Sequence, residues 1–153
     1  MIENRSADRG AVFPRLVYDD VDAAIAWLCA AFGFSEKLRY GAPGRSDGAQ
    51  LNVGTGSVSL TRSRTGQSPG WNDAARLAPP RPGEVCCSIG VRVENIDAHH
   101  ARALAHGARI VGAPQTYMFG ERQYTAEDLA GYRWGFTESV ADVAPETWGG
   151  RVP

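Results

Sequence analysis

Residues 120–136, GERQYTAEDLAGYRWGF, bring acidic, basic and phenolic side chains together in one short stretch. Carboxylates and tyrosines transfer protons in acid–base catalysis, and an arginine can stabilise a developing negative charge. Glu121, Arg122 and Tyr124 are therefore the candidate catalytic residues of this chain.

The same stretch is also typical of a β-hairpin. The DLAG sequence of residues 128–131 has Asp and Gly at the positions that a type I turn favours, so Asp128 is interpreted as a turn former. Tyr124 and Trp134 flank this turn, where paired aromatic side chains stabilise a hairpin with or without a ligand. Arg122 has two open interpretations: it binds the anionic group of a ligand, or it forms a structural ion pair with Glu121, Glu127 or Asp128.

Composition excludes several classes of partner. The 153 residues include 16 basic and 17 acidic side chains, a balance without the positive surface that binds nucleic acid or an anionic membrane. There is no apolar run of membrane-spanning length and no apolar signal region near the start, so we expect a cytoplasmic protein. The three cysteines lack the spacing of a disulfide framework or a zinc site.

A repeat organises the chain. Residues 18–34, YDDVDAAIAWLCAAFGF, align with residues 93–110, VENIDAHHARALAHGARI, so that Asp22 and Asp97 are equivalent at an offset of 75 residues. Each copy has an acidic helix start and a glycine stop, which predicts one amphipathic helix. An alternating segment that predicts a strand precedes each copy, at residues 12–18 and 85–93.

Each helix is expected to bury one apolar stripe. In the first helix the stripe is Ala24, Ile25, Leu28 and Phe32, and in the second it is Ala98, Ala101, Leu104 and Ala105. The three histidines of the chain lie away from the second stripe, which predicts a solvated helix face for His99, His100 and His106.

Three short strand-like segments follow each helix. They are residues 36–40, 50–53 and 58–61 in the first half, and residues 109–111, 123–125 and 133–137 in the second. The sequence therefore predicts an α+β domain over residues 1–153, made of two tandem βαβββ modules, 12–62 and 84–138. A Gly/Pro/Ser-rich linker, 63–83, is long enough to form a flap, and a tail, 139–153, ends the chain.

Two motifs in this order resemble the vicinal-oxygen-chelate superfamily of glyoxalases, bleomycin-resistance proteins and dioxygenases. The wording VYDDVDAAIAWLCAAFGF is similar to the opening strand and helix of its PhnB-like branch, and FGERQYTAEDLAGYRWGF is similar to the closing hairpin. The resemblance implies a fold in which the two modules form a curved, cup-like mixed sheet. It says less about chemistry, because one fold hosts many functions.

The resemblance also implies where a metal would be held. In metal-dependent members four side chains project into the cup, and the corresponding positions here are Phe13, Ser59, Ser88 and Gly135. These are not a plausible ligand set, so we expect no metal and no cofactor. The leading interpretation is metal-independent binding or sequestration of a small organic molecule. The alternative is an enzyme of the same fold, of lyase, isomerase or dioxygenase type, with non-standard or metal-free acid–base chemistry.

The expected ligand site is an aromatic-walled cup with inward-pointing arginines. Such a site favours a partly apolar molecule that carries an anionic group, and it disfavours cationic bleomycin. Because modules of this superfamily commonly form clefts between subunits, a homodimer is expected, with no nucleic acid or membrane partner. The predicted lining is Phe13, Arg15, Ser59, Trp71, Ser88, Tyr117, Phe119, Arg122, Tyr124 and Trp134.

Overall fold

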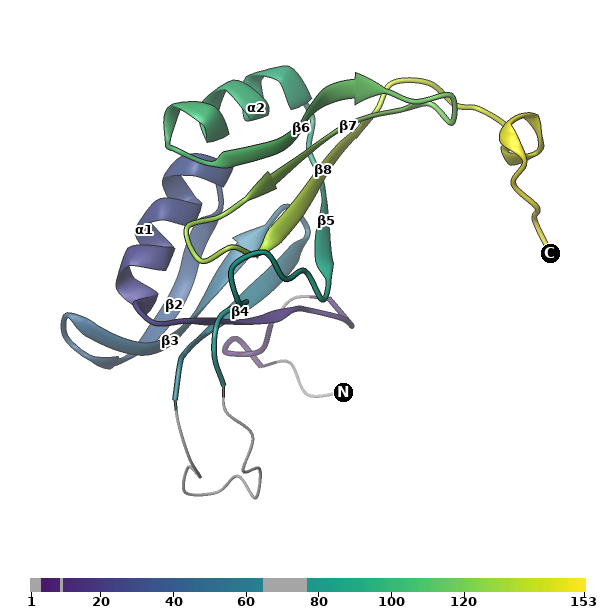
Figure 1. Cartoon of the computed structure of the whole chain (residues 1–153). Helices are drawn as coiled ribbons and strands as arrows, with labels where there is room; N and C mark the ends of the chain where they lie inside the picture. Colours follow the sequence, from purple (N-terminus) through teal and green to yellow (C-terminus); the bar gives the residue numbers. More distant parts are fainter. Residues whose placement is uncertain (1–3, 9, 65–76) are drawn as a thin grey trace.

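The computed structural model describes residues 4–8, 10–64 and 77–153 and confirms the two βαβββ modules (Figure 1). The first contains β1 (Arg15–Tyr18), α1 (Val21–Phe32), β2 (Ser35–Ala42), β3 (Arg45–Val53) and β4 (Gly56–Arg62). The second contains β5 (Ser88–Arg92), α2 (Ile96–Ala105), β6 (Arg109–Thr116), β7 (Glu121–Glu127) and β8 (Arg133–Ser139), and the tail adds a short 3-10 helix, η1 (Pro145–Trp148).

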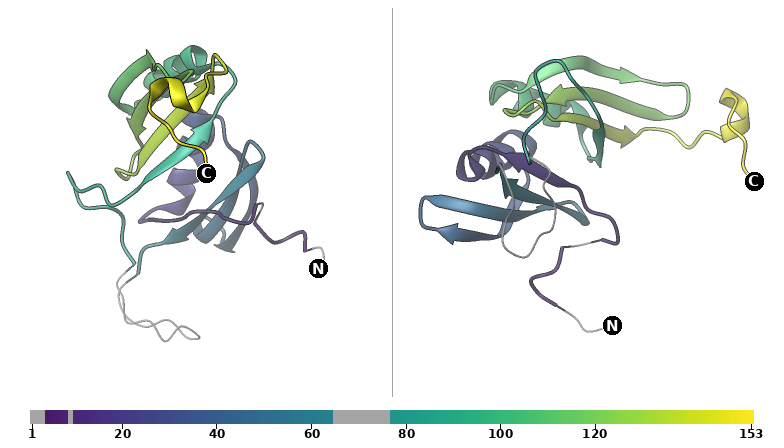
Figure 2. Two further views of the ribbon diagram at one scale, coloured as in Figure 1. Left: turned by 90° about the vertical axis from the view of Figure 1, so that its right-hand side faces the viewer. Right: turned by 60° about the horizontal axis from the view of Figure 1, so that its bottom comes forward.

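The strands form two four-stranded mixed sheets. Their orders are β1-β4-β3-β2 and β5-β8-β7-β6, so the second module repeats the topology of the first. In each sheet the first and last strands of the module pair in parallel, and the other pairs are antiparallel. The second module is stacked over the first, as the two views in Figure 2 show.

Local capping chemistry sets the helix starts and preserves the predicted offset. Asp20 accepts a hydrogen bond from the backbone N–H of Ala23 at 3.0 Å, and Asn95 accepts one from Ala98 at 3.0 Å. The helices begin at the next residues, Val21 and Ile96. Gly33 ends α1 with φ of 70°, a left-handed conformation that favours glycine.

The two modules share one hydrophobic cluster. Phe32, the last residue of α1, contacts Trp134 and Phe136 of β8 with ring-centroid distances of 5.6 Å and 4.8 Å. The predicted stripe of α1 is buried in this cluster, as expected. Burial of large aromatic surface between modules is the main force that holds them together.

The predicted stripe of α2 is wrong. Its alanines and Leu104 are exposed, Leu104 by 56%, whereas Ile96 and Ala103 are buried. The helix is rotated about its axis relative to the predicted orientation. The ring of His99 packs against the ring of Phe136, with a centroid distance of 4.3 Å, and takes the place of an aliphatic side chain. The predicted solvated face is therefore wrong for His99, which is partly buried.

Both initial strands are shorter than their alternating segments. The first begins only after Pro14, whose carbonyl nevertheless accepts a hydrogen bond from the backbone N–H of Ser59 at 3.0 Å. The described ends of the linker meet through an antiparallel bridge between Arg64 and Leu77. Within the described ranges, no helix has the length and apolar character needed to cross a membrane.

Candidate functional site

Alternation along β8 defines the two faces of the second sheet. Trp134 and Phe136 are fully buried against the helices. Since neighbouring side chains of a strand point to opposite faces, Arg133, Gly135 and Thr137 lie on the face turned away from the helices, here called the outer face.

An open pocket of about 440 Å³ lies on this outer face. Gly135 pairs with Gly90 on one side and Thr125 on the other, and a Cβ built at either glycine meets no atom within 4 Å. Gly135, which lines the pocket, therefore leaves its floor without a side chain. Ser88 and Thr125 supply hydroxyl groups at its wall, and Arg133 supplies a guanidinium.

Arg133 has an unused hydrogen-bond donor. Its Nη2 donates to Glu127 Oε1 at 2.6 Å, but its buried Nε has no partner among the residues that the structure describes. A buried donor without a partner costs free energy, which an acceptor group on a bound ligand recovers. Arg133 thus brings to the pocket wall a guanidinium that its ion pair with Glu127 holds in place.

Two glutamates flank the pocket on the same face, and each is already paired. Hydrogen bonds from Arg109 and Arg133 lower the pKa of Glu127, and those from Thr137, Ser139 and Arg92 lower the pKa of Glu121. Both carboxylates are therefore held in the ionised form, which makes Glu121 a weaker base than an ordinary glutamate.

The three candidate catalytic residues do not converge. Glu121 lies on the outer face, whereas Tyr124 is only 2% exposed and belongs to the core. Burial raises the pKa of Tyr124, so its hydroxyl stays protonated. Arg122 lies on the same side of β7 as Tyr124 and donates from Nη2 and Nε to Asp97 of α2, at 2.8 Å and 3.2 Å.

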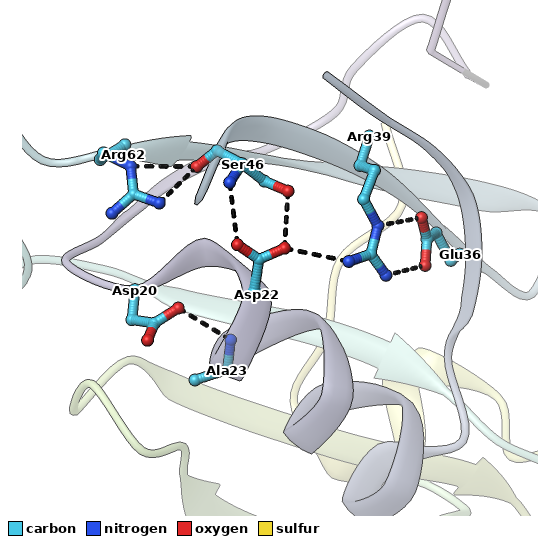
Figure 3. A network of polar contacts seen from close by, with 7 residues as sticks. All are labelled: Asp20, Asp22, Ala23, Glu36, Arg39, Ser46 and Arg62. Carbon is cyan, nitrogen blue, oxygen red and sulfur yellow. Dashed lines mark hydrogen bonds and ion pairs between the residues drawn. The ribbon is translucent and has the colours of Figure 1, made fainter. Parts of the chain in front are cut away.

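The ion pair between Arg122 and Asp97 has a counterpart in the first module. Asp22, the equivalent of Asp97, accepts hydrogen bonds from Arg39 at 3.0 Å and from the backbone N–H and hydroxyl of Ser46 (Figure 3). In both modules an aspartate in the first helical turn thus fastens the helix to its sheet. The partner of Arg122 is this aspartate, not one of the three carboxylates expected from its own hairpin.

The predicted cup residues do not lie in one site but in several parts of the structure. Tyr124 and Trp134 are core residues, and Ser88 lines the outer pocket. Tyr117 and Phe119 stack on each other at 5.3 Å beyond the pocket, in the loop between β6 and β7. Trp71 lies outside the described residues.

The remaining predicted residues belong to the first module. Phe13 precedes β1 and is 36% exposed, while Arg15 pairs in register with Ser59. Ser59 faces away from the helices, because its neighbours in β4 are core residues. Its hydroxyl is not free, since it donates to the Asp8 carboxylate.

His99 joins the modules through its ring nitrogens. Its Nε2 lies 3.0 Å from the carbonyl oxygen of Phe32, which can only accept, and its Nδ1 lies 2.6 Å from the hydroxyl of Tyr124. The neutral imidazole with the proton on Nε2 satisfies both contacts. Burial lowers the pKa of His99, which favours this neutral form.

The positions that the resemblance assigns to a metal do not fit one. Ser59 and Ser88 offer only neutral hydroxyls. Gly135 has no side chain, and the side chain of Phe13 has no lone pair to bind a metal. In the part of the chain that the structure describes, no three His, Cys, Asp or Glu residues group closely enough to hold a metal ion.

Sequence reasoning missed Thr125 and Arg133 as pocket residues. The available signal was the alternation itself, because a strand that buries Trp134 and Phe136 must turn Arg133 and Gly135 outward.

The two βαβββ modules and the open outer face of the second sheet are features of a known protein family. The family model described as Glyoxalase/Bleomycin resistance protein/Dioxygenase superfamily matches residues 11–136, and the chain belongs to this family.

Solved structures and sequence relatives are similar to this chain over most of its length. TioX from Micromonospora sp. ML1 is 36% identical with a TM-score of 0.68, over 85% of this chain and 99% of TioX. A lactoylglutathione lyase from Agrobacterium tumefaciens is 19% identical with a TM-score of 0.60, over 92% and 97% of the two chains, a likeness of fold alone. An uncharacterized protein of Mycobacterium tuberculosis (strain ATCC 25618 / H37Rv) is 28% identical over 133 residues, 87% of this chain and 76% of the relative.

Proposed function

We propose that this protein binds a small organic molecule without a metal and without chemical turnover. The observation that carries the proposal is the pocket on the outer face of the second sheet, with Gly135 at its floor and Arg133 at its wall. Hydroxyls and a guanidinium around a bare floor suit a flat molecule that carries a carboxylate or another acceptor group.

The binding proposal is favoured over the enzyme alternative by the placement of the candidate catalytic residues. Glu121 faces outward with a lowered pKa, Tyr124 faces inward with a raised one, and Arg122 is held by α2. Acid–base catalysis requires a donor and an acceptor within reach of one substrate atom. The closing hairpin pattern further supports membership of the PhnB-like branch. We also propose that the protein binds its ligand in the cytoplasm.

Isothermal titration with a panel of aromatic carboxylates, and with bleomycin beside them, tests the proposal. We expect Arg133→Ala to weaken carboxylate binding by about tenfold or more, because a hydrogen bond to a charged group is lost. Arg109→Ala is the matched control: Arg109 donates to the same Glu127 but does not line this pocket. It should change the affinity by no more than about twofold. Tight bleomycin binding, equal losses in both variants, or chemical conversion of the bound carboxylate would contradict the proposal.

We further propose that the binding cleft is completed in a homodimer. The support is an exposed apolar group at the far end of the second module: Met118 is 77% exposed, and Trp148 of the tail is 41% exposed and packs at 5.8 Å from Phe119. The tail extends away from the second sheet (Figure 1), so this group has no further cover within the described chain. Apolar side chains exposed together favour burial against a second copy.

Light scattering at micromolar concentration should give a mass near twice the 16.4 kDa of one chain. Met118→Asp is expected to shift the mass toward the monomer, because it places a charge in the interface. Leu129→Asp, at an exposed site on the turn between β7 and β8, should leave the dimer intact. A monomeric mass for the unaltered protein would refute the homodimer.

A further inference from the structure

The outer face of the first sheet contains buried hydroxyl groups. Ser57 and Ser59 of β4 are only 6% and 7% exposed, although both point away from the helices and the core. Both hydroxyls donate to Asp8, which lies in the N-terminal segment of residues 4–8. A segment far away in sequence therefore covers this polar face.

The segment is attached through one carboxylate. Both Asp8 oxygens accept from Ser59 Oγ, at 3.0 Å and 2.9 Å, and Asp8 Oδ1 also accepts from Ser57 Oγ at 3.3 Å. Gln50 Nε2 donates to Asp8 Oδ2 at 3.4 Å and to the Ser6 carbonyl at 2.9 Å. Lys37 Nζ donates to the carbonyl of Ala7. These donors make a carboxylate-binding group of neutral hydroxyls and an amide.

Little else holds the segment. Asn4 closes a turn by accepting from the backbone N–H of Ala7 at 3.0 Å, and residues 4–7 are exposed, with Asp8 only partly buried. A turn that rests on polar contacts without apolar burial opens at low free-energy cost. The carboxylate-binding group can therefore be vacated while the fold stays intact.

The same face has two buried acceptors that the segment does not satisfy. Within residues 4–8, 10–64 and 77–153, Gln50 Oε1 and Asn52 Oδ1 have no hydrogen-bond partner, and they belong to alternate residues of β3. Gln50 pairs in register with Ser59, and Asn52 pairs with Ser57. Acceptors in this position require a donor that residues 4–8 do not bring.

We propose that Asp8 occupies a second carboxylate-binding site, on the outer face of the first sheet and distinct from the Arg133 pocket of the second sheet, and that the ligand of this site is a carboxylic acid with a neighbouring O–H or N–H donor. The ligand carboxylate takes the place of Asp8 on Ser57, Ser59 and Gln50, and its donor reaches the unsatisfied amide oxygens. The N-terminal segment competes with the ligand for this face. This inference goes beyond the proposed function: it adds a second binding site on the first sheet, a ligand class for that site and an internal competitor.

Calorimetric titration with salicylate, benzoate and phenol tests this inference. Salicylate has a carboxylate beside a hydroxyl donor, benzoate has only the carboxylate, and phenol only the hydroxyl. We expect Asp8→Ala to strengthen salicylate binding by about tenfold, because the competitor is removed, and Ser59→Ala in that background to abolish the gain. Asp142→Ala, at an exposed aspartate in the tail, is the matched control and should have no effect.

A second readout follows the segment itself. In ¹H–¹⁵N spectra of the unaltered protein, salicylate should move the amide signals of residues 4–8 toward random-coil positions, and benzoate should do so more weakly. Equal salicylate affinity with and without Asp8, no salicylate binding by Asp8→Ala at millimolar concentration, or unmoved signals would overturn the inference. If Arg133→Ala still abolishes binding of an aromatic carboxylate while Asp8→Ala changes nothing, the proposed function stands and only this inference fails.

Discussion

Replacing Phe32 with alanine should lower the free energy of unfolding by about 3–5 kcal/mol, the usual cost of removing a fully buried phenylalanine. The ring is 3% exposed and contacts aromatic rings of both modules. Its loss leaves a cavity between α1 and β8, where both backbones are fixed by their own hydrogen bonds and cannot collapse. We therefore expect the contact between the modules and the global fold to be lost in one transition.

Urea denaturation at one fixed protein concentration measures this loss, because a dimer makes the apparent stability depend on concentration. Phe13→Ala is the matched control, since it removes the same side chain at a 36% exposed site. It should cost less than about 1 kcal/mol. Two separate transitions in the unaltered protein, one for each module, would show that Phe32 does not couple them.

The elements that the sequence predicted well are those fixed by local chemistry. Asp20 caps α1 through a backbone group three residues away, and the turn after β7 is closed by the Asp128 side chain accepting from the backbone N–H of Ala130 at 2.9 Å. Gly131 of this turn has φ of 90°, as a glycine there permits. Such signals are contained within a few residues, and the repeat doubled them.

The orientation of α2 was not predictable from apolar spacing alone. Alanines are weakly apolar and fit an exposed face, whereas His99 contributes a ring that stacks on the aromatic core and has both nitrogens satisfied. Only the tertiary partners Phe32 and Tyr124 make the buried position acceptable for an imidazole. A count of apolar residues therefore selects the wrong side of this helix.

The pocket residues were missed for a different reason. Tyr124 and Trp134 were placed in the cup because aromatic side chains often form ligand walls, yet both are among the largest fully buried side chains. Strict alternation around Phe136 would have exchanged Trp134 for Arg133. The contact of Asp8 with Ser59 joins residues 51 positions apart and leaves no local pattern in the sequence.

Replacing Asp128 with alanine should lower the free energy of unfolding by about 3–4 kcal/mol, because it leaves several buried donors without an acceptor. Asp128 Oδ2 accepts from the Tyr18 hydroxyl at 2.7 Å and from Trp134 Nε1 at 3.0 Å, while Oδ1 accepts from the backbone N–H groups of Ala130 and Tyr132. The carboxylate thereby ties β1 of the first module to β8 of the second.

The variant Asp128→Asn separates the two halves of this network. The amide oxygen can keep both backbone contacts, but the amide nitrogen then faces the N–H of Trp134, so we expect an intermediate loss of about 1–2 kcal/mol. Burial, with the charge of Asp128 second, raises the pKa of Tyr18 well above its ordinary value, so the phenol remains a donor throughout the neutral range. Leu129→Ala, in the same turn but 47% exposed, is the control and should change stability by less than about 0.5 kcal/mol in the same urea titration. If Asp128→Ala is as stable as that control, Asp128 acts only within its turn and does not join the modules.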